Sequence, residues 1–396
     1  MLKLLLIALG AIAAGWLSLA VGAAGTTRQH APQRALEWWP NDARALAELA
    51  SRTLAEGSPA QRREAGAMAA RAIRRDPLLP DPYAVLALSR VEDERFATRM
   101  MGYSQDLSRR NLATQLWLIE DAVRRNDVAG ALRHYDTALR ASPRAPELLF
   151  PVLSAAIAEP AVTTELARVL AREPRWRIAF IAHAIEHSPV PARIDDLSRL
   201  SARLGHPFGA GLDTLLITRL VDEGQYRRAL ALYERAIDPA QARRLIRNGG
   251  FERPGAGTSF DWLLFDEGDL WARRGQGPDG IRLEFGANAG RGGAVARQTL
   301  LLPPGRYRLG AESGSLEGGD AISPTLVVRC AGEGGAELLR LPLRMPADGA
   351  ARSAAAMAVP AGCPAQTIAL ELVGDPAGAE RSGWIDSLTV APASAS

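Results

Sequence analysis

Three residues in the middle of the chain have the types and the spacing of a zinc site. His183, Glu186 and His187 follow the pattern H-x-x-E-H, which on a helix sets two imidazoles one turn apart with a carboxylate between them. Such a group can hold zinc while the glutamate acts as the base for hydrolysis. The alternative is structural, because His187 lies in the last turn before Pro189, where the helix dipole favours histidine. No downstream glutamate stands out as a third ligand, so we prefer the structural interpretation.

The composition excludes other kinds of chemistry. Lys3 is the only lysine among 47 basic residues, so no GKS or GKT phosphate loop and no Schiff-base or serine–lysine machinery can exist in the folded part. The formal net charge is only +3, and the basic residues do not form the dense stripe that binding of a phosphate backbone requires. We therefore expect no nucleic-acid partner.

The N-terminal segment predicts export. Residues 4–24 carry no charge, and as a helix they would span about 31 Å, which matches a bilayer core. Lys3 precedes this run, so the positive-inside rule predicts a signal anchor over residues 1–25 in a bacterial inner membrane, a juxtamembrane linker over 26–44 and a periplasmic remainder. A cleaved signal peptide is the alternative, because residues 21–24 are small and offer a peptidase site.

A change of composition near Ile246 separates two kinds of structure. Before it, apolar residues recur at helical spacing. After it, short alternating runs are separated by Gly, Pro and Asp, and 25 of the 37 glycines occur there. With 396 residues, of which 47% are hydrophobic, the chain can bury two or more cores. We therefore predict a multidomain protein with an all-α domain over 45–246 and an all-β domain over 247–396.

One spacing recurs in the helical part. Small or aromatic residues stand at relative positions 0, 4 and 7, which lie on one face of a helix, and a proline at position 12 ends the helix. Two segments keep all four positions: Ala65, Ala69, Ala72 and Pro77, then Ala131, Tyr135, Ala138 and Pro143. The pattern resembles the second helix of a tetratricopeptide repeat. The resemblance implies a helical solenoid whose concave surface binds a protein partner. The alternative is a compact helical bundle without a groove in use.

The C-terminal part is predicted to be an antiparallel β-sandwich. Eight short alternating runs separated by turns suit this architecture, and they are residues 281–285, 294–302, 305–311, 325–329, 338–343, 353–359, 367–373 and 385–390. The part opens on Asn-Gly-Gly-Phe-Glu (248–252), contains the hairpin Leu-Pro-Pro-Gly-Arg-Tyr (302–307) and closes on Gly-Trp-Ile-Asp (383–386). These motifs resemble the jelly rolls of carbohydrate-binding modules and galactose-binding-like domains.

The resemblance implies two kinds of site. A structural calcium ion would be held by Glu252 and Asp386, although a complete calcium site takes six to eight oxygen ligands. Sugars would stack on exposed aromatic rings, and the candidates for such platforms are Trp271, Trp262 and Phe260, with Tyr307 and Trp384 as further ones. Several of these positions match core positions of the family, so packing is the alternative role of each ring. Apart from this calcium ion, we expect no cofactor.

The two cysteines are expected to form a disulfide. Cys330 follows one predicted strand and Cys363 follows another, and an exported domain is exposed to an oxidising compartment. A pair of buried free thiols is the alternative.

These features together favour a binding role. We expect a non-enzymatic, membrane-anchored periplasmic adaptor that holds a protein partner through its helical repeats, in cell-envelope or exopolysaccharide assembly. Two alternatives stay open. One is a glycan-binding protein that acts through the β-sandwich, and the other is an exported zinc hydrolase that uses His183, Glu186 and His187.

Overall fold

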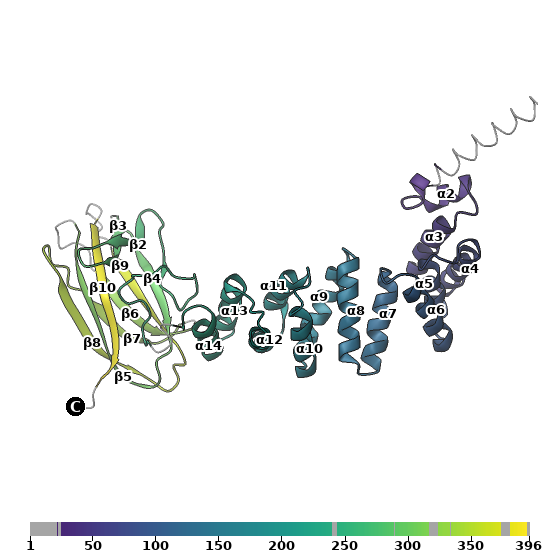
Figure 1. Ribbon diagram of the computed structural model, residues 1–396. Helices are drawn as coiled ribbons and strands as arrows, with labels where there is room; N and C mark the ends of the chain where they lie inside the picture. Colours follow the sequence, from purple (N-terminus) through teal and green to yellow (C-terminus); the bar gives the residue numbers. More distant parts are fainter. Residues whose placement is uncertain are drawn as a thin grey trace, which may run out of the picture. The chain divides into compact units, whose positions relative to one another are not determined.

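The computed structural model describes residues 22, 25–239, 244–288, 290–316, 324–332, 334–373 and 381–393 (Figure 1). The chain divides into two compact units, Met1–Phe180 and Ile181–Ser396. Helices build the first unit, and the second unit contains further helices followed by the strands.

The helical part consists of short helices in series. Their bounds are α2 (Pro32–Trp38), α3 (Ala43–Ala55), α4 (Pro59–Arg75), α5 (Asp81–Leu88), α6 (Glu94–Leu107), α7 (Leu112–Arg124), α8 (Val128–Ala141), α9 (Ala145–Ala156), α10 (Pro160–Leu170), α11 (Arg177–His187), α12 (Pro191–Arg203), α13 (Ala210–Asp222) and α14 (Tyr226–Ala236). Consecutive helices pack as pairs, α3 with α4, α5 with α6, α7 with α8, and α13 with α14.

Side-chain caps set where these helices begin. Ser58 and Gln61 form a capping box at the start of α4, and Asp127 Oδ1 accepts a hydrogen bond of 2.7 Å from Gly130 N at the start of α8. Each cap satisfies a backbone N–H that has no partner inside the helix.

The residues with the recurring 0, 4, 7 spacing lie on packed faces. Ala65, Ala69 and Ala72 of α4 are fully buried. On α8, Tyr135 is buried between two buried alanines of the same spacing. The spacing therefore identified the inward faces of α4 and α8, because a small residue there lets the paired helix approach.

The structure contradicts the predicted location in the inner membrane. Within the described ranges, no helix is both long and apolar enough to cross a bilayer. Most of residues 4–24, on which the anchor was predicted, lie outside the described residues.

The strands form two five-stranded antiparallel sheets. One has the order β1-β4-β9-β6-β7 and the other β2-β3-β10-β5-β8. Their bounds are β1 (Leu263–Leu264), β2 (Leu270–Gln276), β3 (Ile281–Ala287), β4 (Gly292–Leu300), β5 (Gly305–Ser315), β6 (Thr325–Cys330), β7 (Glu337–Pro342), β8 (Ala351–Val359), β9 (Gln366–Val373) and β10 (Arg381–Pro392). Each of the eight predicted runs is a strand, while β1 and β2 were not predicted.

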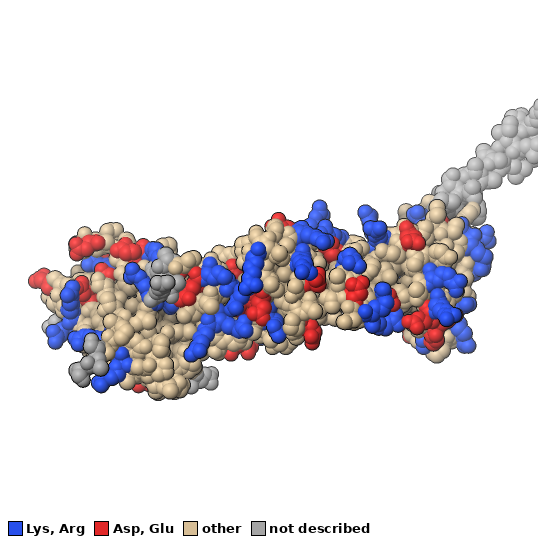
Figure 2. Space-filling model, turned by 60° about the horizontal axis from the view of Figure 1, so that its bottom comes forward, with Lys and Arg blue, Asp and Glu red and all other residues tan. Residues whose placement is uncertain are grey.

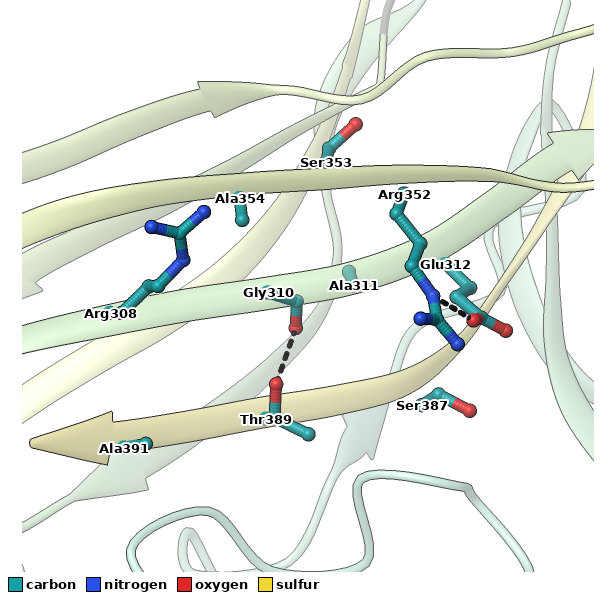
Figure 3. Close-up of a pocket in the computed structure, with 10 residues that line it drawn as sticks. All are labelled: Arg308, Gly310, Ala311, Glu312, Arg352, Ser353, Ala354, Ser387, Thr389 and Ala391. Atoms are coloured by element: carbon teal, nitrogen blue, oxygen red, sulfur yellow. Dashed lines mark hydrogen bonds and ion pairs between the residues drawn. The ribbon is translucent and has the colours of Figure 1, made fainter.

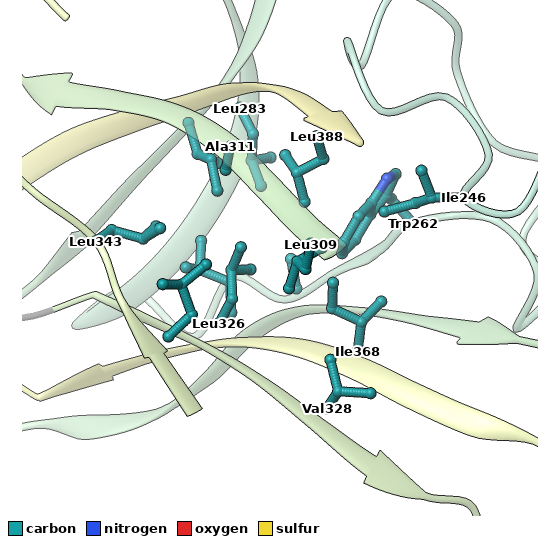
Figure 4. Packing of buried hydrophobic residues seen from close by; sticks show 14 of the residues in the cluster. Ile246, Trp262, Leu283, Leu309, Ala311, Leu326, Val328, Leu343, Ile368 and Leu388 are labelled. Atoms are coloured by element: carbon teal, nitrogen blue, oxygen red, sulfur yellow. The ribbon is translucent and has the colours of Figure 1, made fainter. Parts of the chain in front are cut away.

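One hydrophobic core fills the space between the two sheets (Figure 4). Leu326 and Ile368 enter it from one sheet, and Leu283 and Leu309 enter it from the other. Trp262 closes the core beside Ile246 and Leu388 (Figure 4). Successive side chains of a strand point to opposite faces of its sheet. The apolar ones lie on the inner faces, so the outer faces carry polar and functional side chains.

The last helix is joined to the sandwich by a buried polar contact. Tyr233 of α14 packs its ring against Phe260, with 5.6 Å between ring centroids, and its hydroxyl donates to Asp261 Oδ1 at 2.7 Å. The buried guanidinium of Arg247 lies over both rings and 3.6 Å from Glu234 Oε1. Helix α14 and the start of the sandwich therefore form one packed structure.

Cys330 and Cys363 form a disulfide, as predicted, with 5.5 Å between their Cα atoms. The bridge ties the end of β6 to the turn before β9. Such bridges form in oxidising compartments outside the cytoplasm.

Candidate functional site

The sheet β2-β3-β10-β5-β8 presents two tryptophans on its outer face. Along β2, Leu270 and Ala272 are buried, so Trp271 between them points to the opposite side of the sheet. On β10, Ile385 is buried in the core, and Trp384 before it points outward. Strand β3 lies between β2 and β10, which puts the two rings on one surface, two strands or roughly 10 Å apart across the sheet.

Each tryptophan ring lies over a glycine of the neighbouring strand. Trp271 is opposite Gly286, where an added Cβ would stand 2.6 Å from the indole Cε2. Trp384 is opposite Gly314, where an added Cβ would stand 2.7 Å from the indole Nε1. A side chain at Gly286 would therefore push the ring of Trp271 off the sheet, and one at Gly314 would meet both the ring of Trp384 and, at 2.6 Å, the carbonyl oxygen of Gly349. The two rings form what we call the tryptophan face, defined by Trp271 and Trp384.

An arginine stacks on each ring, and the two arginines differ in how firmly they are held. The guanidinium of Arg273 lies 4.5 Å from the centroid of Trp271, and its side chain is 67% exposed. The guanidinium of Arg282 lies 5.1 Å from the centroid of Trp384 and is ion-paired with Glu284 at 3.3 Å, and the Arg282 side chain is only 16% exposed. Trp271 is therefore the ring that a ligand can uncover more easily.

The other predicted platforms are core residues. Phe260 is fully buried, Trp262 is 8% exposed, and the ring of Trp262 packs against Phe251 at 5.3 Å. Tyr307 is also buried, and its hydroxyl donates to the carbonyl of Pro303 at 2.8 Å. A buried ring has no exposed face on which a sugar can stack, so Trp262 and Phe260 are not platforms.

A cavity of about 500 Å³ opens on the same sheet, over β5, β8 and β10 (Figure 3). Arg308 stands at one end of it, and Arg352 with its partner Glu312 stands at the other (Figure 3). We call it the Arg308 cavity. The sequence analysis did not single out these residues. The sequence did hold a signal for them. Every second residue of a strand faces outward, so the outward positions of the strands β5 and β8 could have been identified as one surface.

The two carboxylates proposed for calcium lie near each other. Glu252 Oε1 accepts a hydrogen bond from Ile281 N at 3.1 Å, and Asp386 accepts one from Ser387 N. Burial raises the pKa of Asp386, and the charges of Glu252 and Glu312 raise it further. In the part of the chain that the structure describes, no three His, Cys, Asp or Glu side chains are grouped to hold a metal. A calcium ion takes six to eight oxygen ligands, so these two carboxylates would make up only part of such a site.

The H-x-x-E-H residues form a stacked histidine pair. The rings of His183 and His187 lie 4.3 Å apart and nearly parallel, and His187 Nδ1 is 3.0 Å from the carbonyl oxygen of His183. Burial lowers the pKa of His183, and His187 lowers it further. Among the described residues, no third His, Cys, Asp or Glu side chain joins this pair in a group that could hold a metal.

Charged side chains of both signs alternate over the face shown in Figure 2, without a continuous basic surface.

Comparison with known proteins finds similarity at the level of fold. No family model matches the chain, and no curated protein sequence matches it, so the tetratricopeptide resemblance is not confirmed. The C-terminal region resembles carbohydrate-binding jelly rolls. One solved structure is a family 4 carbohydrate-binding module, with 18% identity, coverage of 37% of this chain and 99% of the other, and a TM-score of 0.29.

Two further structures give similar values. The module TmCBM61 in complex with β-1,4-galactotriose has 18% identity, coverage of 38% and 99%, and a TM-score of 0.28. The N-terminal cellulose-binding domain of Cellulomonas fimi β-1,4-glucanase C has 15% identity, coverage of 38% and 98%, and a TM-score of 0.27. At these scores the function has to be argued from the site itself.

Proposed function

We propose that the C-terminal sandwich binds polysaccharide on the tryptophan face. The observation that carries this proposal is the placement of Trp271 and Trp384, two indoles that lie over glycines on one solvent-facing sheet. Flat aromatic surfaces favour stacking with the apolar face of a sugar ring, and the spacing of the two rings suits a chain of several sugars. The role is one of binding, without catalysis.

Polar groups around the rings supply the hydrogen bonds that sugar hydroxyls require. Arg273 can turn from the ring of Trp271 to a sugar hydroxyl, since most of its side chain is exposed and its ion pair with Glu284 is long, at 4.0 Å. Glu284 of β3 stands opposite Trp384 and is ion-paired with Arg282 at 3.3 Å and with Arg273 at 4.0 Å. An apolar surface with a few oriented polar groups is the usual composition of a ligand site.

The proposal is tested by affinity electrophoresis of the full chain in gels that contain xylan, galactan, β-glucan or polygalacturonate. We expect at least one polymer to retard the wild type and Trp271→Ala to lose the retardation. Trp38→Ala is the matched control, because Trp38 is an exposed tryptophan of the first unit. Both variants should keep the melting temperature of the wild type within a few degrees. A wild type that no polymer retards would overturn the proposal.

Binding of a protein by the helical part is a second candidate. It is supported by Leu148 and Val152, which stand one turn apart on α9 and are 53% and 57% exposed. Apolar side chains paired in this way on a helix surface often mark a contact. Chemical crosslinking in cells is the test. The double variant Leu148→Asp/Val152→Asp should lose the crosslinked species, and Leu78→Asp, which changes another exposed leucine of the same unit, should keep it.

A further inference from the structure

The Arg308 cavity carries a positive charge that no described carboxylate neutralises. Its lining contains two arginines and one glutamate. Arg352 is bonded to Glu312, whereas Arg308 has no ion-pair partner among the described residues. Arg308 lies on β5 opposite Ala356 of β8, so no long side chain across that strand pair shields it. An exposed guanidinium at the end of a cavity is suited to bind an anionic group.

The floor of the cavity is flat because its residues are small. Gly310 of β5 stands between Ala354 of β8 and Thr389 of β10, and Ala391 of β10 lies beside Arg308 (Figure 3). A Cβ at Gly310 would stand 3.2 Å from Thr389 Oγ1, so glycine leaves the space beside this hydroxyl open. The hydroxyl of Thr389 donates to Gly310 O over a long distance of 3.5 Å. This hydrogen bond is weak, so a ligand can replace it.

A β-bulge directs a second hydroxyl to this cavity. The pairing of β10 with β5 shifts register between Asp386 and Thr389, and Ser387 in the bulge has a φ of 51°. Only a few per cent of residues other than glycine adopt a positive φ. Bulges often re-aim a side chain beside a binding site, and here Ser387 is one of the residues that line the cavity.

We propose that the Arg308 cavity binds the carboxylate of a uronic acid, so that the sandwich recognises an acidic polysaccharide. Arg308 pairs with the carboxylate, the small floor accepts the pyranose ring, and Thr389, Ser387 and Glu312 bond to ring hydroxyls. At the far end Arg352 and Glu312 neutralise each other, so a densely sulfated polymer would find no second unpaired cation there. The inference rests on the proposed function, because it names the class of sugar that the same sheet binds.

The experiment compares two polymers that share one backbone. The full chain is titrated with polygalacturonate and with its methyl-esterified form, in which the carboxylates are neutral. We expect polygalacturonate to bind at least about tenfold more tightly than the ester, and Arg308→Gln to remove about tenfold of that affinity, which is the usual value of a hydrogen-bonded charge pair. Arg306→Gln is the matched control, because Arg306 points outward two residues earlier on β5 but lies outside the cavity lining. It should change the affinity less than twofold.

The outcomes separate this inference from the proposed function. If Trp271→Ala abolishes binding while the ester binds as tightly as the acid and Arg308→Gln has no effect, the tryptophan face binds sugar and the uronate inference is wrong. If Arg308→Gln weakens binding and Trp271→Ala does not, the cavity binds uronate and the tryptophan face is not the platform. Equal affinity for dextran sulfate, weakened equally by Arg306→Gln and Arg308→Gln, would reduce the effect to general attraction of polyanions and overturn the inference.

Discussion

The hydroxyl of Tyr233 donates a hydrogen bond of 2.7 Å to Oδ1 of Asp261, across 28 residues of sequence. Asp261 also accepts hydrogen bonds from Ala256 N, Thr258 N and Thr258 Oγ1 on its other oxygen, so its buried carboxylate is well solvated by the protein. Burial raises the pKa of Tyr233, and the bond to Asp261 raises it further. The phenol of Tyr233 is therefore protonated and acts as a donor at neutral pH.

Tyr233→Phe should destabilise the second unit by about 1–3 kcal/mol, because a buried carboxylate loses a donor. Urea denaturation followed by fluorescence measures the change. Tyr103→Phe serves as the control, since Tyr103 is 48% exposed. Equal stability of Tyr233→Phe and the wild type would show that the bond is not formed in solution.

Trp262→Ala should destabilise the sandwich by about 3–5 kcal/mol, as expected when a large ring is removed from a packed core. Trp271→Ala should lower the stability of the sandwich much less, because the ring of Trp271 lies on the surface of the sheet. Thermal melts of the two variants provide the comparison. A larger loss for Trp271→Ala would mean that this ring mainly serves to cover Gly286, since aromatic rings over glycines also stabilise sheets.

Gly286→Val should displace the ring of Trp271 and reduce polysaccharide retention while the protein stays folded. The physical reason is the 2.6 Å approach between an added Cβ and the indole. Affinity electrophoresis with a circular dichroism control checks both parts. Gly362→Ala is the matched variant, because a Cβ there meets nothing within 4 Å. Unchanged retention by Gly286→Val would show that the position of this ring does not matter for binding.

Asp213→Asn should stabilise the protein at pH 7. Burial raises the pKa of Asp213 above its ordinary value, against a smaller opposing effect of Arg235. Folding therefore favours the neutral carboxyl of Asp213. The stability that this neutral form contributes is fully present below the ordinary pKa and is lost as the pH rises through the raised pKa.

The asparagine stays neutral throughout, so its advantage should be largest at pH 7 and should shrink as the pH falls toward 4. Melting temperatures of wild type and variant across this range measure the effect. An advantage that does not depend on pH would have a cause other than the charge.

Removing the disulfide should lower the free energy of unfolding by about 3–4 kcal/mol. The loop between Cys330 and Cys363 spans 33 residues, and this is the chain-entropy value for a loop of that length. Urea denaturation of Cys330→Ser/Cys363→Ser against the oxidised wild type gives the difference. Mass spectrometry of unreduced peptides should show the two cysteines linked, and alkylation of both without reduction would contradict the bridge.

Local patterns in the sequence determined the elements and their inner faces. The alternation that predicted eight strands arises because a strand points successive residues to opposite sides, and it works wherever one side is buried. The spacing of Ala65, Ala69 and Ala72 located a packed helix face for a similar reason. Strands β1 and β2 escaped prediction, since β1 has two residues and β2 continues into Arg273, Arg274 and Gly275 without a second apolar run.

Tertiary structure decided how the aromatic residues are exposed. In the sequence, the charged neighbours Asp269 and Arg273 favour Trp271 over Trp262 as a platform, but they do not specify the face of the sheet on which its ring lies. Trp262 is buried in the core, and Trp271 lies on the outer face because Gly286, on another strand, leaves room for its ring. The Arg308 cavity likewise depends on the sheet order that brings β10 and β8 to the two sides of β5. Such pairings follow from the closure of the sheets, which no local spacing of residues specifies.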